Sequence, residues 1–145
     1  MNTKKKKKIA WGITGIVVII FLILNLFYAI AVVSGDSMYP TYTNGQVLLT
    51  AKYYDIDRFD VVTIYHDTIL IKRVIGMPNE TIKYEDNILY INGEQVDDPY
   101  NTVTEDFEIT LGDDEYFCLG DNREVSWDSR RYGAFNRMYI IAEVL

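Results

Sequence analysis

The sequence predicts a mainly β domain, either barrel-like or built from mixed sheets, that follows a single N-terminal transmembrane helix. Three observations support this fold class. An uncharged stretch of 25 residues lies near the start of the 145-residue chain. After residue 33 come short runs rich in Val, Ile, Tyr and Thr, separated by turn residues. No segment beyond residue 33 shows apolar residues at helical spacing over about three turns.

Residues 9–33 are long and apolar enough to form a membrane anchor. The segment has no charged residue, and only Thr14 and Asn25 interrupt it as clearly polar side chains. About 20 apolar residues cross the hydrocarbon layer, so this stretch can span it with some tilt. Trp11 and Tyr28 lie near its two ends, and aromatic residues favour the membrane interface.

The lysine run from Lys4 to Lys8 sets the expected orientation of this anchor. Basic residues accumulate on the cytoplasmic side of a membrane helix. We therefore expect a cytoplasmic basic tail at residues 1–8 and an extracytoplasmic domain at residues 34–145. The chain would then be a single-pass protein of the plasma membrane.

A cleavable signal peptide is the alternative reading of the same segment. The small-residue triplet 29–31 would then be followed by cleavage after Ala31. The apolar stretch before the triplet is about 20 residues long, against roughly 7–15 in a typical signal peptide. This length favours a retained anchor, and a mature N-terminus near Val32 would indicate the alternative.

Seven short runs are expected as strands of the outer domain. They are residues 46–52, 60–65, 69–75, 81–85, 88–91, 115–119 and 139–144. The dipeptide 86–87 separates two of these runs as a tight hairpin does, and Asn92-Gly93 is a favoured two-residue turn. Short strands joined in this way predict the all-β, mixed-sheet or barrel-like domain.

The outer domain is strongly acidic. From Ser34 onward there are 9 basic and 21 acidic residues, which gives a net charge of 9 − 21 = −12. Nucleic-acid binding needs clustered Lys and Arg, so we expect no nucleic-acid partner. Cys118 is the only cysteine, so the chain cannot form an intrachain disulfide. It lies in an apolar run, where a buried, inert thiol is expected.

Only four serines occur, and they fall in two clusters. The first is the sequence Ser-Gly-Asp-Ser-Met-Tyr-Pro-Thr at residues 34–41. Gly35 permits tight backbone geometry beside Ser37, and Pro40 stiffens the chain after it. Such a loop can present a hydroxyl and a backbone N–H in fixed positions, although an ordinary juxtamembrane turn has the same composition.

A nucleophilic serine needs a base, and the sequence offers a histidine and a lysine. The only histidine, His66, falls in an expected hairpin turn, where polar residues are exposed, so a Ser-His-Asp triad lacks a good candidate. Lys72 instead has apolar neighbours on both sides within residues 69–76. Burial lowers the pKa of a lysine from about 10.4, which makes Lys72 a plausible general base. A lysine snorkelling at a strand edge is the alternative.

The second serine cluster, residues 120–130, follows an expected strand and is dense in hydrogen-bonding groups. It can orient a lysine amine through a hydroxyl and stabilise its own conformation through an Asp-Arg pair. A calcium-binding loop is the metal alternative. It fails because Arg123 and Val125 occupy ligand positions of that pattern, so we expect no metal.

Together, three segments resemble the type I signal peptidases, the serine-lysine proteases of family S26. The compact domain, which lacks a large second insertion, is similar to that of Gram-positive bacterial members. Residues 34–41 resemble the nucleophile box S-G-x-S-M-x-P-T. Residues 72–78 resemble the general-base box K-R-V-I-G-x-P, and residues 120–130 match G-D-N-R-x-x-S-x-D-S-R. The resemblance implies a signal-peptidase-like β-barrel or mixed-sheet catalytic domain behind an N-terminal anchor.

Transferred by position, the resemblance implies that Ser37 is the nucleophile and Lys72 the general base. Ser126 would hydrogen-bond the lysine amine, and an ion pair between Asp128 and Arg130 would hold the last box together. No cofactor is implied.

The resemblance also assigns supporting roles around this pair. Asp121 and Arg73 would support the site, and the backbone N–H of Ser37 would form part of the oxyanion hole. Some relatives place a second oxyanion donor, a serine hydroxyl, two residues before the nucleophile, where this chain has Gly35. The sequence does not identify the group in the Gly35 region that replaces this second donor.

Two further departures concern expected turns. Arg58-Phe59-Asp60 stands where the family often has R-G-D, and Asn79-Glu80 replaces the usual G-D. Both sites are expected to be structural.

The implied activity is removal of signal peptides from exported pre-proteins at small-x-small sites, typically Ala-x-Ala. Pre-proteins, the lipid bilayer and a nearby secretion translocon are the implied partners. Two other classes remain open at this point: a non-catalytic relative that serves in assembly, and a self-cleaving regulator of the repressor type.

Overall fold

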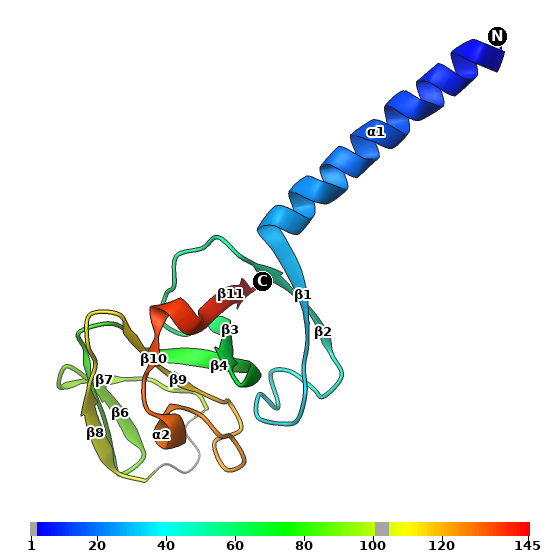
Figure 1. Cartoon of the computed structure of the whole chain (residues 1–145). Coiled ribbons are helices and arrows are strands. Elements are labelled where there is room, and N and C mark those ends of the chain that lie inside the picture. Colours follow the sequence, from blue (N-terminus) through cyan, green and yellow to red (C-terminus); the bar gives the residue numbers. More distant parts are fainter. Residues whose placement is uncertain (1–2, 101–104) are drawn as a thin grey trace.

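The computed structural model describes residues 3–100 and 105–145, and it is mainly β with one long N-terminal helix. The helix, α1 (Thr3–Phe27), projects away from a domain made of two antiparallel sheets (Figure 1). The predicted fold class is therefore confirmed.

The larger sheet has seven strands, in the spatial order β1-β2-β11-β3-β4-β9-β10. Its members are β1 (Tyr28–Val32), β2 (Val47–Ala51), β3 (Val61–His66), β4 (Thr68–Gly76), β9 (Glu115–Leu119), β10 (Phe135–Asn136) and β11 (Ile140–Val144). The smaller sheet, in the order β7-β6-β5-β8, consists of β5 (Thr81–Glu85), β6 (Ile88–Ile91), β7 (Glu94–Val96) and β8 (Phe107–Thr110). Two short helices, α2 (Ser129–Tyr132) and η1 (Arg137–Tyr139), lie between β9 and β11.

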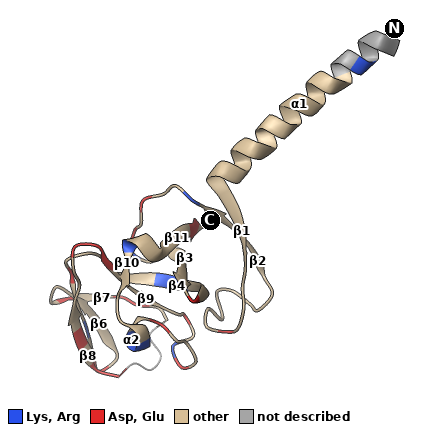
Figure 2. Ribbon diagram, in the orientation of Figure 1, with Lys and Arg blue, Asp and Glu red and all other residues tan. Residues whose placement is uncertain are grey.

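Helix α1 contains the candidate membrane span, Ala10–Phe27, with a mean hydropathy of 2.4 and no residue buried against the domain. Figure 2 shows acidic residues spread over the β domain and an uncharged helix beyond its first turns. A long apolar helix with no protein partner is the pattern of a membrane-spanning segment.

The helix ends at Phe27, before the end of the 9–33 segment expected from the sequence, because Tyr28–Val32 forms β1. Ala29, Ile30 and Ala31 pair with β2 in an antiparallel ladder. Lys52 ends the helix: its backbone N–H donates to Phe27 O and its amine donates to Asn25 O, both at 2.8 Å. These bonds satisfy terminal carbonyls and place a cation at the helix C-terminus.

Strand β4 lies inside the larger sheet, but one of its two edges is paired with a neighbouring strand along only part of its length. β3 pairs with Thr68–Arg73 of β4, whereas β9 pairs with β4 only from Arg73 onward. On that side, no strand in the described part of the chain pairs with residues 68–72. Lys72 therefore lies where the sheet interior gives way to an open edge.

The predicted turns and strands are confirmed in most places. All seven expected runs are strands within two residues, and both residues of the 86–87 and 92–93 turns have positive φ, as two-residue hairpins require. The strands β1, β7, β8 and β10 were not predicted. They are short or, in β1, hidden within the apolar anchor sequence.

The two departures from glycine fall at positions of positive φ. Phe59 has φ 72° and Asn79 has φ 66°, a region that glycine adopts without a steric penalty. Arg58 forms an ion pair with Glu80 and donates to Ile75 O, which ties the two turns together. These departures are therefore backbone features of the scaffold, and the Phe59 carbonyl also accepts from Arg73 at 2.7 Å.

A buried polar cluster joins the smaller sheet to the segment after β9. Arg123 Nη1 lies 2.7 Å from Asp98 Oδ2, and both side chains are almost fully buried. Arg123 also donates to Tyr84 Oη at 3.1 Å and to Gly120 O at 2.9 Å. Every charge in the cluster is paired, which is the condition for burying it.

We predict that Asp98→Asn lowers the free energy of unfolding by about 3–5 kcal/mol, because it leaves the Arg123 guanidinium buried without a counter-charge. Urea unfolding of the full-length chain in detergent micelles measures the change. The matched control is Glu85→Gln, which removes an exposed pair with Lys83 and should leave the unfolding midpoint unchanged. Equal effects of the two substitutions would contradict a buried, stabilising role for Asp98.

Candidate active site

The loop between β1 and β2 carries the first serine cluster in a fixed conformation. Val33 N donates to Gln46 O and Gly45 N donates to Val33 O, both at 2.9 Å, which closes the loop at its base. Gly35 has φ 87° and donates its N–H to Asn44 Oδ1 at 3.0 Å. Next to Ser37, the Met38 side chain is buried in the core. The nucleophile candidate is thus held by a rigid turn.

Strand β4 brings Lys72 to this serine. The residues are 35 apart in sequence, yet Lys72 Nζ lies 2.8 Å from Ser37 Oγ. Lys72 is only 3% exposed. The predicted nucleophile and base are therefore within hydrogen-bonding distance, with the lysine buried and the serine half-buried.

The environment of Lys72 favours its neutral form. Burial lowers the pKa of Lys72 below its ordinary value of 10.5, because a low-dielectric interior destabilises the ammonium. The carboxylates of Asp128 and Asp121 act in the opposite direction, and burial is the larger effect. A larger fraction of Lys72 can therefore accept a proton at neutral pH than of an exposed lysine.

The segment after β9 packs directly against this pair, and Gly120 makes that approach possible. A Cβ on Gly120 would collide with the Ser126 side chain and with the carbonyl oxygen of Ser37. Asn122 N donates to that same Ser37 carbonyl at 3.0 Å. The absence of a side chain at residue 120 thus lets the segment contact the nucleophile loop.

Asp128 and Arg130 stabilise this segment through a bidentate ion pair. Arg130 Nε and Nη2 each lie 2.9 Å from one oxygen of Asp128. Asp128 is fully buried and also accepts from Gly120 N at 3.0 Å. The carboxylate therefore connects the two ends of the segment, at Gly120 and Arg130.

A second bidentate pair links β4 to the same segment. Arg73 donates to the two oxygens of Asp121 at 2.8 and 2.7 Å, and Thr41 of the nucleophile loop donates to Asp121 as well. The Arg73 guanidinium lies over the Tyr100 ring, 4.6 Å from its centroid. Asp121 thus joins all three segments that carry candidate site residues.

Ser126 is placed differently from the expectation. Its hydroxyl lies against Gly120, and its Oγ is buried without a hydrogen-bond partner among the described residues. The expected bond to Lys72 is not formed in the structure, where the amine donates to Ser37 Oγ. An unpaired buried hydroxyl is costly, and the ammonium form of Lys72 has three N–H groups to donate.

Two hollows meet at Ser37. A cavity of about 60 Å³ is lined by Val33, Met38 and Ile71, among others, with Ser37 and Lys72 at its wall. A more open groove of about 450 Å³ runs past the same dyad. Its walls are formed by the nucleophile loop (34–37), Leu70, and the segment after β9, where Asn122, Val125 and Trp127 contribute.

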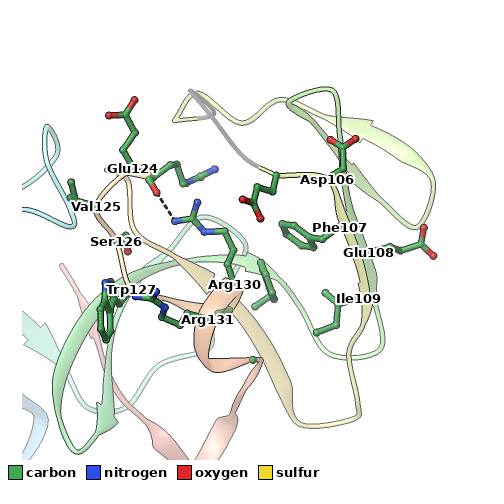
Figure 3. A pocket seen from close by; sticks show the side chains of 15 residues that line it. Asp106, Phe107, Glu108, Ile109, Glu124, Val125, Ser126, Trp127, Arg130 and Arg131 are labelled. Carbon is green, nitrogen blue, oxygen red and sulfur yellow. Dashed lines mark hydrogen bonds between the residues drawn. The ribbon is translucent and has the colours of Figure 1, made fainter.

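A larger hollow of about 810 Å³ lies beyond the 120–130 segment (Figure 3). Phe107 and Ile109 of β8 line one side of it, and Arg130 lies on the other. Neither Ser37 nor Lys72 contributes to its lining. Despite its size, this hollow is therefore separate from the candidate chemistry.

The remaining reactive side chains play no part in the site. His66 is the last residue of β3 and is half-buried, whereas the sequence predicted an exposed side chain. Its ring packs on that of Tyr132, with 4.4 Å between the ring centroids. Cys118 is fully buried, and burial raises the pKa of its thiol. Within residues 3–100 and 105–145, no group of three or more His, Cys, Asp or Glu side chains is placed to hold a metal.

Sequence reasoning missed three contributors to the site. Thr41 and Asn122 lie within the recognised segments, so their position could have suggested a role. Tyr100 had no such signal, because it lies in an irregular stretch and reaches Arg73 only through the tertiary fold.

Comparisons with known proteins identify the family of this chain. The family profile described as signal peptidase, peptidase S26, matches residues 6–145. Signal peptidase I S of Bacillus subtilis is 40% identical, covering 96% of this chain and 88% of that protein. Signal peptidase I of Streptococcus pneumoniae is 31% identical, with coverages of 99% and 93%.

Solved structures point the same way. The crystal structure of a signal peptidase I from Enterococcus faecalis matches with a TM-score of 0.58 and 32% identity, covering 63% of this chain and 97% of that one. The chain therefore belongs to the signal peptidase family, peptidase S26, and is a serine-protease hydrolase.

Proposed function

We propose that this chain removes signal peptides from exported pre-proteins with a Ser-Lys dyad formed by Ser37 and Lys72. The observation that carries the proposal is the 2.8 Å separation of Lys72 Nζ from Ser37 Oγ, in a site where Lys72 is buried and its pKa is lowered. A neutral amine at this distance can take the hydroxyl proton directly.

The reaction then follows from the dyad. Lys72 accepts the Ser37 proton as Ser37 Oγ adds to the scissile carbonyl carbon. The Lys72 ammonium returns that proton to the leaving amine as the peptide bond breaks, which leaves an acyl-enzyme on Ser37. The neutral amine next takes a proton from water, whose oxygen adds to the ester carbonyl carbon. The Lys72 ammonium then returns this proton to Ser37 Oγ as the ester bond breaks, which releases the signal peptide and restores the dyad.

The open edge of β4 supports an extended substrate. Residues 69–71 lack a strand neighbour on the side away from β3 within the described chain, so a pre-protein segment can pair there by β-augmentation. Leu70 lines both hollows at Ser37. The cavity of about 60 Å³ equals the space of about two water molecules, which suits a methyl group and excludes a branched side chain. This size supports cleavage after small-x-small sequences such as Ala-x-Ala.

The position of the dyad supports action at the membrane surface. Ser37 lies ten residues after Phe27, the last residue of α1, and α1 continues directly into β1. With Lys4 to Lys8 at the cytoplasmic end, the catalytic domain lies outside, where pre-proteins leave the secretion translocon. The lipid bilayer would hold enzyme and substrate at the same height.

The pairing of β1 favours a retained anchor over cleavage after Ala31. Ala31 is paired with Leu48, and the carbonyl of Ala29 accepts from Thr50 Oγ1 at 3.1 Å. A bond held within a sheet is a poor protease substrate because cleavage needs local unfolding.

We predict that Ser37→Ala and Lys72→Ala each abolish cleavage of a pre-protein while leaving the thermal unfolding midpoint near that of the wild type. Each substitution removes one of the two groups that transfer the proton. Gel-based cleavage of a pre-protein by the full-length chain in detergent micelles measures activity. Lys83→Ala, at an exposed lysine of β5, should cleave normally. Full activity of either dyad variant would refute the assignment.

We also predict that kcat/KM rises from acid to mildly alkaline pH, because only neutral Lys72 accepts the Ser37 proton. Since burial lowers the Lys72 pKa, the rise should occur below the pH expected from an exposed lysine. Lys72→Arg should be inactive at every pH, because a guanidinium does not deprotonate. A pH-independent rate in a folded enzyme would exclude a titrating lysine.

Enlarging the small cavity should relax specificity. We predict that Ile71→Ala increases kcat/KM at least about 10-fold for a pre-protein with Val directly before the scissile bond, because it frees room for the added methyl groups. Ile141→Ala, at an exposed position of β11, is the matched control. An unchanged preference in Ile71→Ala would place the specificity cavity elsewhere.

A further inference from the structure

The peptide group between Asp36 and Ser37 is held at its oxygen end by two donors. Asp36 O accepts the backbone N–H of Tyr39 at 3.1 Å and the side-chain amide of Asn122 at 3.1 Å. A carbonyl oxygen only accepts, so the amide nitrogen of Asn122 faces it. Both lone pairs of the Asp36 carbonyl are therefore used.

Fixing this oxygen also fixes the direction of the Ser37 N–H. A trans peptide is planar, and its C=O and N–H point in opposite directions. Rotation of the Asp36–Ser37 peptide would turn the N–H away and bring the carbonyl oxygen round in its place. The Ser37 N–H itself bonds no acceptor among residues 3–100 and 105–145. It is therefore free to donate to a bound group.

We propose that Asn122 is a positioning residue for the oxyanion hole: its side-chain amide holds the Asp36–Ser37 peptide so that the Ser37 N–H faces the substrate oxygen. This inference rests on the proposed function, since it requires Ser37 to be the nucleophile. It names the group that preorganises the predicted donor.

The surroundings of Asn122 agree with this role. Asn122 lines the same groove as Ser37 and Lys72. Its backbone N–H donates to Ser37 O at 3.0 Å, so one residue restrains the peptide groups on both sides of the nucleophile. Asn122 makes no hydrogen bond to Lys72 among the contacts of the described residues, so its removal should leave the Lys72 proton affinity unchanged.

The effect should appear in the transition state and not in substrate binding. The Tyr39 bond remains when Asn122 is changed, so the peptide is loosened and not released. We expect Asn122→Ala to lower kcat about 10–100-fold, less than the roughly 10²–10³-fold cost of deleting an oxyanion donor outright. KM should stay within about twofold, and the pH midpoint of the activity profile should not shift.

The test uses the full-length chain in detergent micelles and a pre-protein with an Ala-x-Ala site. Asn122→Ala and the nearly isosteric Asn122→Asp, which cannot donate to Asp36 O when ionised, are compared with the wild type for kcat, KM and thermal unfolding. The affinity of a peptide aldehyde is measured as well. Its adduct with Ser37 has a tetrahedral carbon, and the oxygen on this carbon lies where the oxyanion forms. The affinity for the aldehyde should therefore fall with kcat.

Asn136→Ala, which removes the cap of η1, controls for loss of an asparagine side chain and should keep wild-type kcat. Unchanged kcat in both Asn122 variants, or a rise in KM alone, would overturn the inference. So would a loss of activity that follows the unfolding midpoint without weakening aldehyde binding in the remaining folded enzyme. Ser37→Ala separates the two levels: if it still cleaves, the proposed function fails, and if only the Asn122 variants are normal, this inference alone fails.

Discussion

The burial of one lysine amine is the constraint on which the candidate site depends. Lys72 is 3% exposed, so its ammonium form is destabilised, but two carboxylates nearby would restore that form if they were left free. Each is instead bound by an arginine, Asp128 by Arg130 and Asp121 by Arg73. Because these bidentate pairs satisfy the carboxylates, they weaken the attraction of both for a proton on Lys72.

The same ion pairs also determine the shape of the site. Asp121 is bonded from β4 and from the nucleophile loop, while Asp128 closes the segment that begins at Gly120. Electrostatic tuning and mechanical support are therefore carried by the same side chains. A substitution at either aspartate would disturb both, which makes activity loss alone a poor measure of its contribution to the chemistry.

Runs rich in Val, Ile, Tyr and Thr predicted the long strands, and turn residues predicted the hairpins at 86–87 and 92–93, because both patterns are local. β1 was missed since its residues are as apolar as the anchor before them, and only pairing with β2 makes them a strand. That Lys72 lies next to Ser37 was expected because the segments that carry them resemble two motifs of one family. The orientation of the Ser126 hydroxyl and the arrival of Tyr100 depend on packing across the domain, which no local pattern encodes.

Helix α1 passes into β1 without an intervening linker, and this continuity restricts how the enzyme meets its substrate. With α1 in a bilayer, the catalytic domain would search a surface and not a volume, in a narrow range of tilts. A flexible tether would dilute the domain over a larger space, and effective concentration falls steeply with tether length. With α1 in a bilayer, this direct junction would raise the local concentration of the proposed dyad for membrane-held chains and lower it for soluble ones, which would give selectivity by location before any side chain is recognised.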